Sequence, residues 1–173
     1  MADIESMVKA LSGELGEKAY EVSDSLALLG GEAVLKAMLE LLEHSQRESR
    51  FMAARTLGKM HENAPALQPL FEAINNKENK GFAGDLLATI ENYDLSGSYV
   101  EIFKLYLNGS FKVSAIAQDY LDYKDFEITQ RVIKKASKHW NHYVNNVKQD
   151  ELFDLKKIEV EERLNDLKAY LEC

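Results

Sequence analysis

The sequence has little proline, glycine or cysteine for a chain of 173 residues: two prolines, nine glycines and one cysteine. So few turn-forming residues argue against an all-β fold, because such a fold needs frequent turns. The single cysteine, Cys173, excludes a disulfide within the chain and a metal site built from several cysteines. The sequence therefore predicts an all-α protein without covalent cross-links.

The sequence also lacks a long uninterrupted apolar run. The most apolar stretch, residues 25–42, is broken by Glu32, Lys36 and Glu40, so we expect no transmembrane helix. The first residues do not follow the basic-then-apolar pattern of a secretory signal. These features predict a soluble cytoplasmic protein that does not insert into membranes.

Positive charge is scarce, with 21 Lys+Arg against 29 Asp+Glu and a formal net charge of -8. Residues 1–125 hold 12 basic and 20 acidic side chains, whereas residues 126–173 hold nine of each. An acidic chain repels phosphate backbones, so we expect no nucleic-acid partner. Opposite potentials favour association, so a protein partner with a basic segment fits better.

Apolar residues recur at i, i+3, i+4 and i+7 along nearly the whole chain, which predicts amphipathic helices. Short polar interruptions between them indicate antiparallel neighbours. The predicted helices span residues 3–13, 17–29, 32–44, 47–60, 64–76, 79–92, 97–108, 111–123, 126–146 and 151–171.

A repeat of 33 residues relates the first helices of successive pairs, residues 31–42, 64–75 and 97–108. The second helices share matched columns with slightly different offsets. One column consists of leucines, the next position is small in three of four copies, and a third column is mostly acidic. These columns are Leu26, Leu57, Leu87 and Leu121; Ala27, Gly58, Ala88 and Asp122; and Asp24, Arg55, Asp85 and Asp119.

The segment from Arg50 to Gly58 resembles the second-helix signature of HEAT repeats, particularly the short bacterial type of phycobilisome-lyase-like proteins. Its Arg50, two alanines, Leu57 and Gly58 occupy the signature positions, and Pro69 lies where such repeats often kink their first helix. The resemblance covers about residues 17–124. It implies an α-solenoid, a right-handed superhelix of about five antiparallel helix pairs. The alternative is a compact helical bundle with accidental periodicity.

The domain prediction is one solenoid, with HEAT-like repeats over residues 1–125 and a C-terminal helical cap over residues 126–173. The last helix carries an apolar stripe, which either closes the core or pairs with a second copy of the chain. We favour the cap and a monomer, with Leu164 and Leu167 packed on Ile133, over a homodimer through this helix. The stripe consists of Val160, Leu164, Leu167 and Leu171.

No catalytic, cofactor-binding or metal-binding constellation stands out. His139 and His142 share a helix face, but the sequence offers no nearby carboxylate to complete a metal site, so packing or surface roles are favoured. The recurring aspartates, Asp24, Asp85 and Asp119, fit a structural feature of the repeat better than catalysis.

We therefore expect a non-enzymatic scaffold or adaptor that binds a protein partner along the face of its second helices. Candidate contacts on that face are Glu21, Arg55, Lys59 and Asp85. The resemblance also leaves two enzymatic alternatives, a bilin lyase of the phycobilisome-lyase type and a DNA-repair enzyme of the HEAT-like type.

Overall fold

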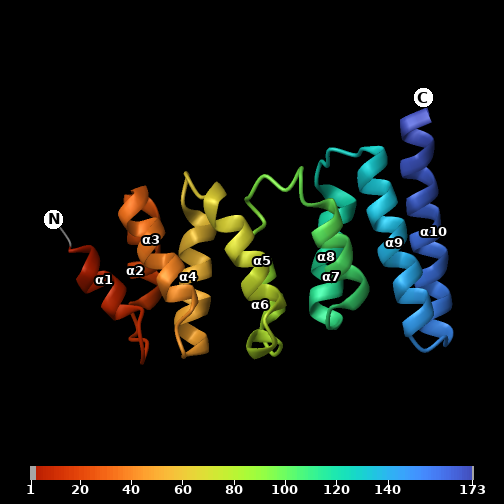
Figure 1. Ribbon diagram of the computed structural model, residues 1–173. Helices are drawn as coiled ribbons and strands as arrows, with labels where there is room; N and C mark the ends of the chain where they lie inside the picture. The colour runs from red at the N-terminus through yellow and green to blue at the C-terminus, as the bar shows by residue number, and fades with distance from the viewer. Residues whose placement is uncertain (1–2, 173) are drawn as a thin grey trace. The chain divides into compact units, whose positions relative to one another are not determined.

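The computed structural model describes residues 3–172, and the chain divides into an N-terminal unit, Met1–Asp94, and a C-terminal unit, Leu95–Cys173. All regular structure in the described residues is helical (Figure 1). The N-terminal unit contains α1 (Ile4–Ala10), α2 (Ala19–Leu29), α3 (Gly31–Leu42), α4 (Arg47–Lys59), α5 (Leu67–Asn75) and α6 (Ala83–Ala88). The C-terminal unit contains α7 (Tyr99–Asn108), α8 (Phe111–Tyr123), α9 (Gln130–Asn146) and α10 (Glu151–Glu172).

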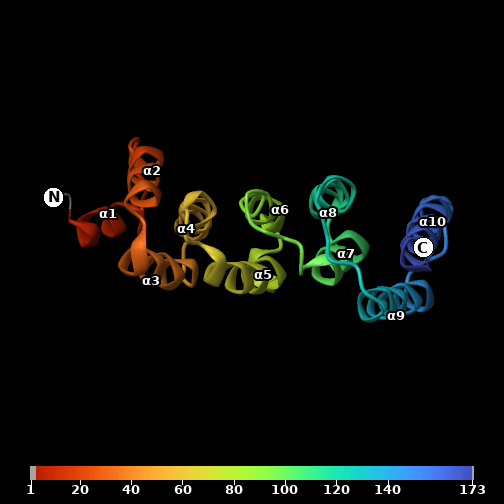
Figure 2. The same cartoon turned by 90° about the horizontal axis from the view of Figure 1, so that it is seen from above.

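The helices pack in successive pairs, which confirms the predicted all-α fold. In the N-terminal unit α3 packs on α4 and α5 on α6, while the second helices α2, α4 and α6 contact one another in turn. Figure 2 shows α2, α4 and α6 on one side of this unit and α3 and α5 on the other. In the C-terminal unit α7 packs on α8 and α9, and α9 on α10.

The leucine column of the second helices forms the core in both units. Leu26, Leu57 and Leu87 are fully buried, and Leu121 is buried in the C-terminal unit. Between α2 and α3 the chain turns at Gly30, whose φ of 59° is a left-handed conformation that favours glycine. The leucine column seen in the sequence therefore consists of core residues.

The helix predicted over residues 79–92 is the main difference from expectation, because α6 spans only Ala83–Ala88. A 3₁₀ turn, η2 (Lys77–Asn79), precedes it, and the buried Asn79 side chain donates a hydrogen bond to the Ala73 carbonyl. This bond holds the chain in a tight turn where a regular helix would otherwise begin. Ala88, the third member of the small-residue column, is therefore exposed at the end of α6 and not packed against a neighbouring helix.

Two further segments begin later than the sequence predicts. The 3₁₀ turn η1 (Ala64–Ala66) changes to α-helix at Leu67, so Pro69 lies in the first turn of α5, where its missing N–H is tolerated. Helix α9 begins at Gln130, and Phe126 precedes it, packed edge-on against Tyr99 with ring centroids 5.3 Å apart.

Helix α10 closes the core of the C-terminal unit. Val160 and Leu164 are buried, Leu167 and Leu171 are half-buried, and Phe153 stacks on Trp140 at 6.2 Å. Arg163 of α10 binds Asp122 of α8 at 2.6 Å, which explains why an acidic residue replaces the small one in the fourth copy. The predicted boundary at residue 125 and the predicted oligomeric state stay predictions.

No helix in residues 3–172 is both long enough and apolar enough to cross a membrane. Cys173 lies outside the described residues.

Candidate protein-binding site

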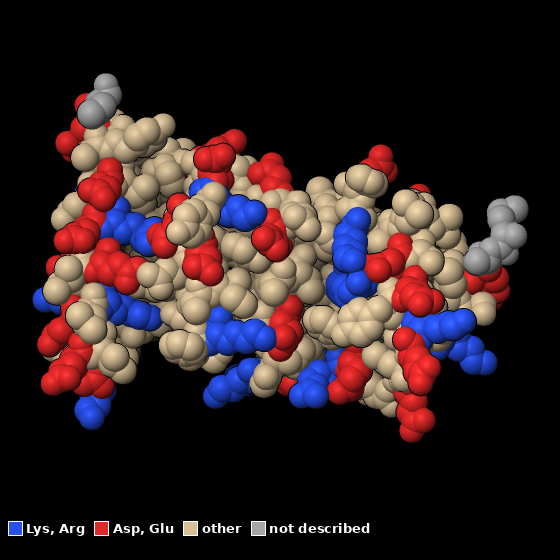
Figure 3. Space-filling view, turned by 180° about the vertical axis from the view of Figure 1, so that it is seen from behind, with Lys and Arg blue, Asp and Glu red and all other residues tan. Residues whose placement is uncertain are grey.

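A groove of about 380 Å³ lies on the second-helix side of the N-terminal unit. Figure 3 shows this side of the molecule, where acidic and basic side chains are interspersed. The groove is lined by Leu15, Tyr20, Arg47, Glu48, Phe51, Met52, Gly81, Phe82 and Asp85. Residues of α2, α4 and α6, together with those just before α2 and α6, therefore form one concave surface.

The repeat register explains why the surface is hollow at this place. Tyr20, Phe51 and Gly81 each lie six positions before a leucine of the core column. The third copy carries glycine where the other two carry an aromatic ring, and a Cβ added at Gly81 would meet no atom within 4 Å. The missing side chain leaves open space beside Phe51 and Phe82.

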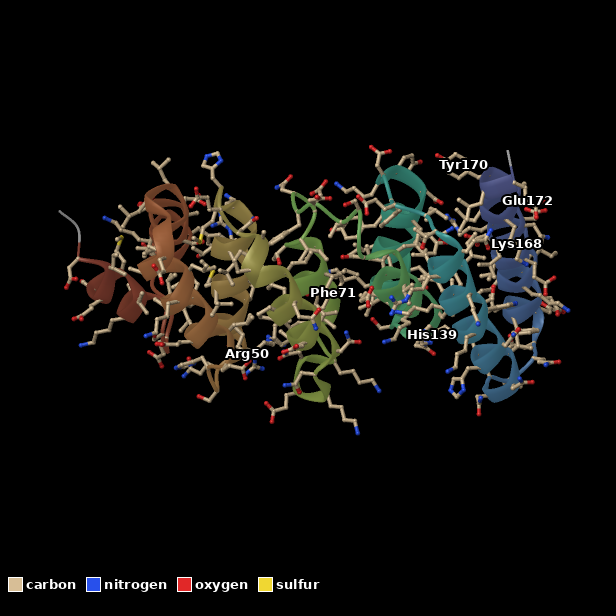
Figure 4. The ribbon with its side chains drawn as sticks, turned by 45° about the horizontal axis from the view of Figure 1, so that its top comes forward. Arg50, Phe71, His139, Lys168, Tyr170 and Glu172 are labelled. Carbon is tan, nitrogen blue, oxygen red and sulfur yellow. The ribbon has the colours of Figure 1, made fainter. Side chains whose placement is uncertain are left out.

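Arg50 lies behind the groove residue Phe82 and has a structural role. Its Nη1 donates hydrogen bonds to the carbonyl oxygens of His44 at 2.7 Å and Ser45 at 2.9 Å, between α3 and α4. Its guanidinium also lies over the Phe82 ring at 5.4 Å from the centroid. The side chain is labelled in Figure 4. The signature arginine thus joins the loop before its own helix to the next repeat.

In the C-terminal unit a different residue stands in the column of Arg50, and different groups bind the backbone carbonyl there. Ser114, which aligns with Arg50, donates to the Tyr106 carbonyl at 2.6 Å, and Lys156 of α10 donates to the same oxygen at 3.0 Å. Burial lowers the pKa of Lys156. A lysine from the last helix therefore supplies the cation that the fourth repeat lacks.

An ion cluster joins α2 to α4 on the same side of the N-terminal unit. Asp24 Oδ1 lies 2.7 Å from Arg55 Nη1 and 2.7 Å from Lys59 Nζ. Arg55 also donates to Ser23 Oγ at 2.7 Å and lies over the Tyr20 ring at 4.9 Å. Hydrogen bonds from Arg55 and Lys59 lower the pKa of Asp24 to about 2.

The lowered pKa predicts acid-dependent stability. Because the folded-state pKa lies below the ordinary 3.8, ionised Asp24 stabilises the folded chain fully above about pH 4, and this stabilisation is lost as the pH falls through 2. Half of the Asp24 side chain is exposed, so solvent screens its ion pairs. We therefore expect them to contribute about 0.2–1 kcal/mol to the free energy of unfolding, as surface ion pairs do. Asp24→Asn should remove this contribution at pH 7.

The measurement is urea unfolding of both proteins at pH 7, 4 and 2, with an NMR titration of the Asp24 carboxyl. The difference in free energy of unfolding between wild type and Asp24→Asn should shrink as the pH falls. Asp119→Asn is the matched control, because Asp119 occupies the same repeat column but forms no ion pair within residues 3–172. An ordinary pKa at Asp24, or equal effects of the two substitutions, would contradict the assignment.

The structure brings some of the four predicted contact residues together. Arg55 and Lys59 meet at Asp24, and the Arg55 side chain is only 17% exposed because it packs against α2. Asp85 lines the groove, whereas Glu21 is exposed on α2 and outside the groove lining. The recurring aspartate column thus provides an inter-repeat ion pair at Asp24.

Sequence reasoning missed the aromatic side chains of the groove. Tyr20 is 55% exposed, Phe51 is half-buried and Phe82 is buried in the groove wall. The repeat register contains the signal, because Tyr20, Phe51 and Gly81 occupy one column in which glycine replaces an aromatic residue.

The two histidines on α9, His139 and His142, are not part of a metal-binding group within the described residues. His139 is half-buried and His142 is exposed, with its backbone carbonyl accepting from Asn146. Burial, and then repulsion from Lys104 and Lys138, lower the pKa of His139. Within the described part of the chain no three His, Cys, Asp or Glu side chains are arranged to hold a metal ion.

Paired helices, a leucine core and contacts between successive second helices define an α-helical repeat domain in the N-terminal unit. The family model of HEAT repeats matches residues 4–88, so this region of the chain consists of HEAT repeats. Comparisons with curated proteins and with solved structures gave no match. The narrower likeness to phycobilisome-lyase-like repeats, and its extension to residue 124, stay predictions.

Proposed function

We propose that the chain is a non-enzymatic interaction module whose N-terminal unit binds a protein partner in the groove of its second-helix side. The observation that supports this most directly is the groove itself, in which three aromatic rings lie beside arginine and carboxylates. Aromatic and arginine side chains in such pockets are the usual anchors of protein interfaces. HEAT-type arrays commonly use their concave surfaces for this purpose.

The charge of the unit favours a partner with a basic segment. Residues 1–94 contain 16 acidic and nine basic side chains, a formal net charge of -7. Glu48 and Asp85 line the groove, and Glu21 is exposed next to Tyr20. A lysine or arginine of the partner would meet these carboxylates while an apolar side chain enters beside Phe51. Arg55 and Lys59 would contribute indirectly, by binding Asp24 and so holding α2 against α4.

The test is affinity capture of partners from the source cell with wild type and with the double variant Glu21→Lys/Glu48→Lys. A partner identified by mass spectrometry is then purified and titrated against each protein. We expect the double variant to weaken binding by roughly tenfold or more, since it replaces attraction by repulsion at Glu48 in the groove lining and at Glu21, the neighbour of Tyr20 in the sequence.

Glu32→Lys/Glu40→Lys is the matched control. Both residues are exposed on α3, on the other side of the same unit, and the charge change is identical. Equal weakening by both double variants would contradict a partner site on the second-helix side. Recovery of a bilin chromophore without any protein partner would instead favour the lyase alternative, and recovery of DNA would favour the repair-enzyme alternative.

A cytoplasmic location belongs to the same proposal and rests on the sequence alone, because a chain with one cysteine has no need of an oxidising compartment.

A further inference from the structure

Helix α9 is strongly basic although the chain is acidic. It carries four basic residues and no acidic one, whereas the remainder of the chain has a formal net charge of -12. All four side chains are exposed, and none forms an ion pair with any residue from 3 to 172. They are Arg131, Lys134, Lys135 and Lys138, which we call the basic face of α9.

The spacing places these cations in one stripe. Positions i, i+3, i+4 and i+7 share a helix face, and the opposite face of α9 packs inward through Ile133, Ala136 and Trp140. At a rise of 1.5 Å per residue the stripe is about 10 Å long. Four positive charges over this length repel one another, so binding of an anionic ligand would reduce their mutual repulsion.

Neighbouring helices extend the positive surface. A hollow of about 570 Å³ lies against the stripe, and its lining includes Lys134 and Lys138 of α9 with Lys168 and Glu172 of α10. Lys168 and Glu172 are labelled in Figure 4. Glu172 is the one carboxylate of the lining, so the cations outnumber it three to one.

The other side of the stripe is also basic. Burial, and then the positive charges of Lys104 of α7, Lys138 and His142, lower the pKa of His139, which is labelled in Figure 4. Glu101 of α7 opposes them as the weakest of these influences. The positive field thus reaches from α10 across α9 to α7.

We propose that the basic face of α9 docks an acidic segment of a protein partner, with the hollow beside it receiving one of that segment's side chains. This surface lies in the C-terminal unit and prefers the opposite charge from the groove of the N-terminal unit. It therefore goes beyond the proposed function. The module would bind a basic segment through one unit and an acidic segment through the other.

Two features favour a short protein segment over other polyanions. A nucleic acid carries charge continuously along its length, and beyond the stripe it would meet the exposed carboxylates Glu101, Glu127 and Glu172. An anionic membrane surface is usually held by cations together with inserting apolar side chains. Among residues 3–172, no large exposed apolar side chain lies on α9.

The test is fluorescence anisotropy of a labelled oligoglutamate peptide titrated with the full chain at low and at physiological salt. We expect saturable binding that weakens with salt. The double variant Lys134→Glu/Lys138→Glu should raise Kd roughly tenfold or more, and Lys134→Gln/Lys138→Gln should raise it by a smaller factor. Circular dichroism confirms that each variant is folded.

Lys77→Glu/Lys80→Glu is the matched control, with the same charge change at two exposed lysines of the N-terminal unit. It should leave Kd within about twofold, since these lysines lie outside the docking surface. No measurable binding of oligoglutamate, or equal weakening by both double variants, would overturn the proposal. So would tighter binding of single-stranded DNA or phosphatidylserine vesicles through Lys134 and Lys138. None of these outcomes bears on the groove, which Glu21 and Glu48 test separately.

Discussion

Truncating Leu57 to alanine should lower the free energy of unfolding of the N-terminal unit by about 2–5 kcal/mol, the range for a buried leucine. Leu57 is fully buried in the column that runs from α2 through α4 to α6. Its carbonyl oxygen accepts from Asn63 at 3.1 Å and from Tyr93 at 3.2 Å. The substitution leaves these backbone contacts in place and removes only apolar packing.

This loss is a large fraction of the free energy of unfolding of a typical domain, which is about 5–15 kcal/mol. Urea unfolding followed by circular dichroism measures the loss, and hydrogen exchange of the α4 amides locates it. Leu28→Ala is the matched control, since the same change is made on α2 at a side chain that is 84% exposed. We expect the control to stay within about 0.5 kcal/mol of wild type. Similar losses in both variants would contradict the core assignment.

Helical periodicity located the elements well because each helix buries one side and exposes the other. The leucine column is the clearest case, since every one of its members is buried. Periodicity failed where a side chain competes with the backbone, as Asn79 does before α6. Helix α9 also begins late, because Thr129 caps it by accepting from the Val132 N–H at 3.3 Å.

The candidate site was predictable in position but not in detail. The second-helix side followed from the repeat, whereas the groove depends on Gly81 standing in a column otherwise held by Tyr20 and Phe51. The pairing of Arg55 and Lys59 with Asp24 depends on how closely α2 approaches α4. A single sequence does not contain that distance, so the ion pairs of the candidate contact residues Arg55 and Lys59 with Asp24 could not be predicted from it.

A small residue lets two neighbouring helices approach closely, and Gly58 is the member of the small-residue column where the approach is closest. A Cβ built on Gly58 would overlap the carbonyl oxygen of Thr89, at the end of α6, and would lie 3.2 Å from its carbonyl carbon. Gly58→Ala should therefore be destabilising, although alanine is the better helix former by about 1 kcal/mol. Overpacking costs about 1–3 kcal/mol, and a rigid backbone neighbour places this site at the upper end.

We accordingly expect Gly58→Ala to lose about 2 kcal/mol net, since the clash outweighs the gain in helix propensity. Gly16→Ala is the matched control, because a Cβ at Gly16 would meet no atom within 4 Å. The control should change the free energy of unfolding by no more than about 0.5 kcal/mol. A stabilised Gly58→Ala protein would mean that α4 and α6 can separate without loss. The close packing of successive second helices would then not be a source of the unit's stability.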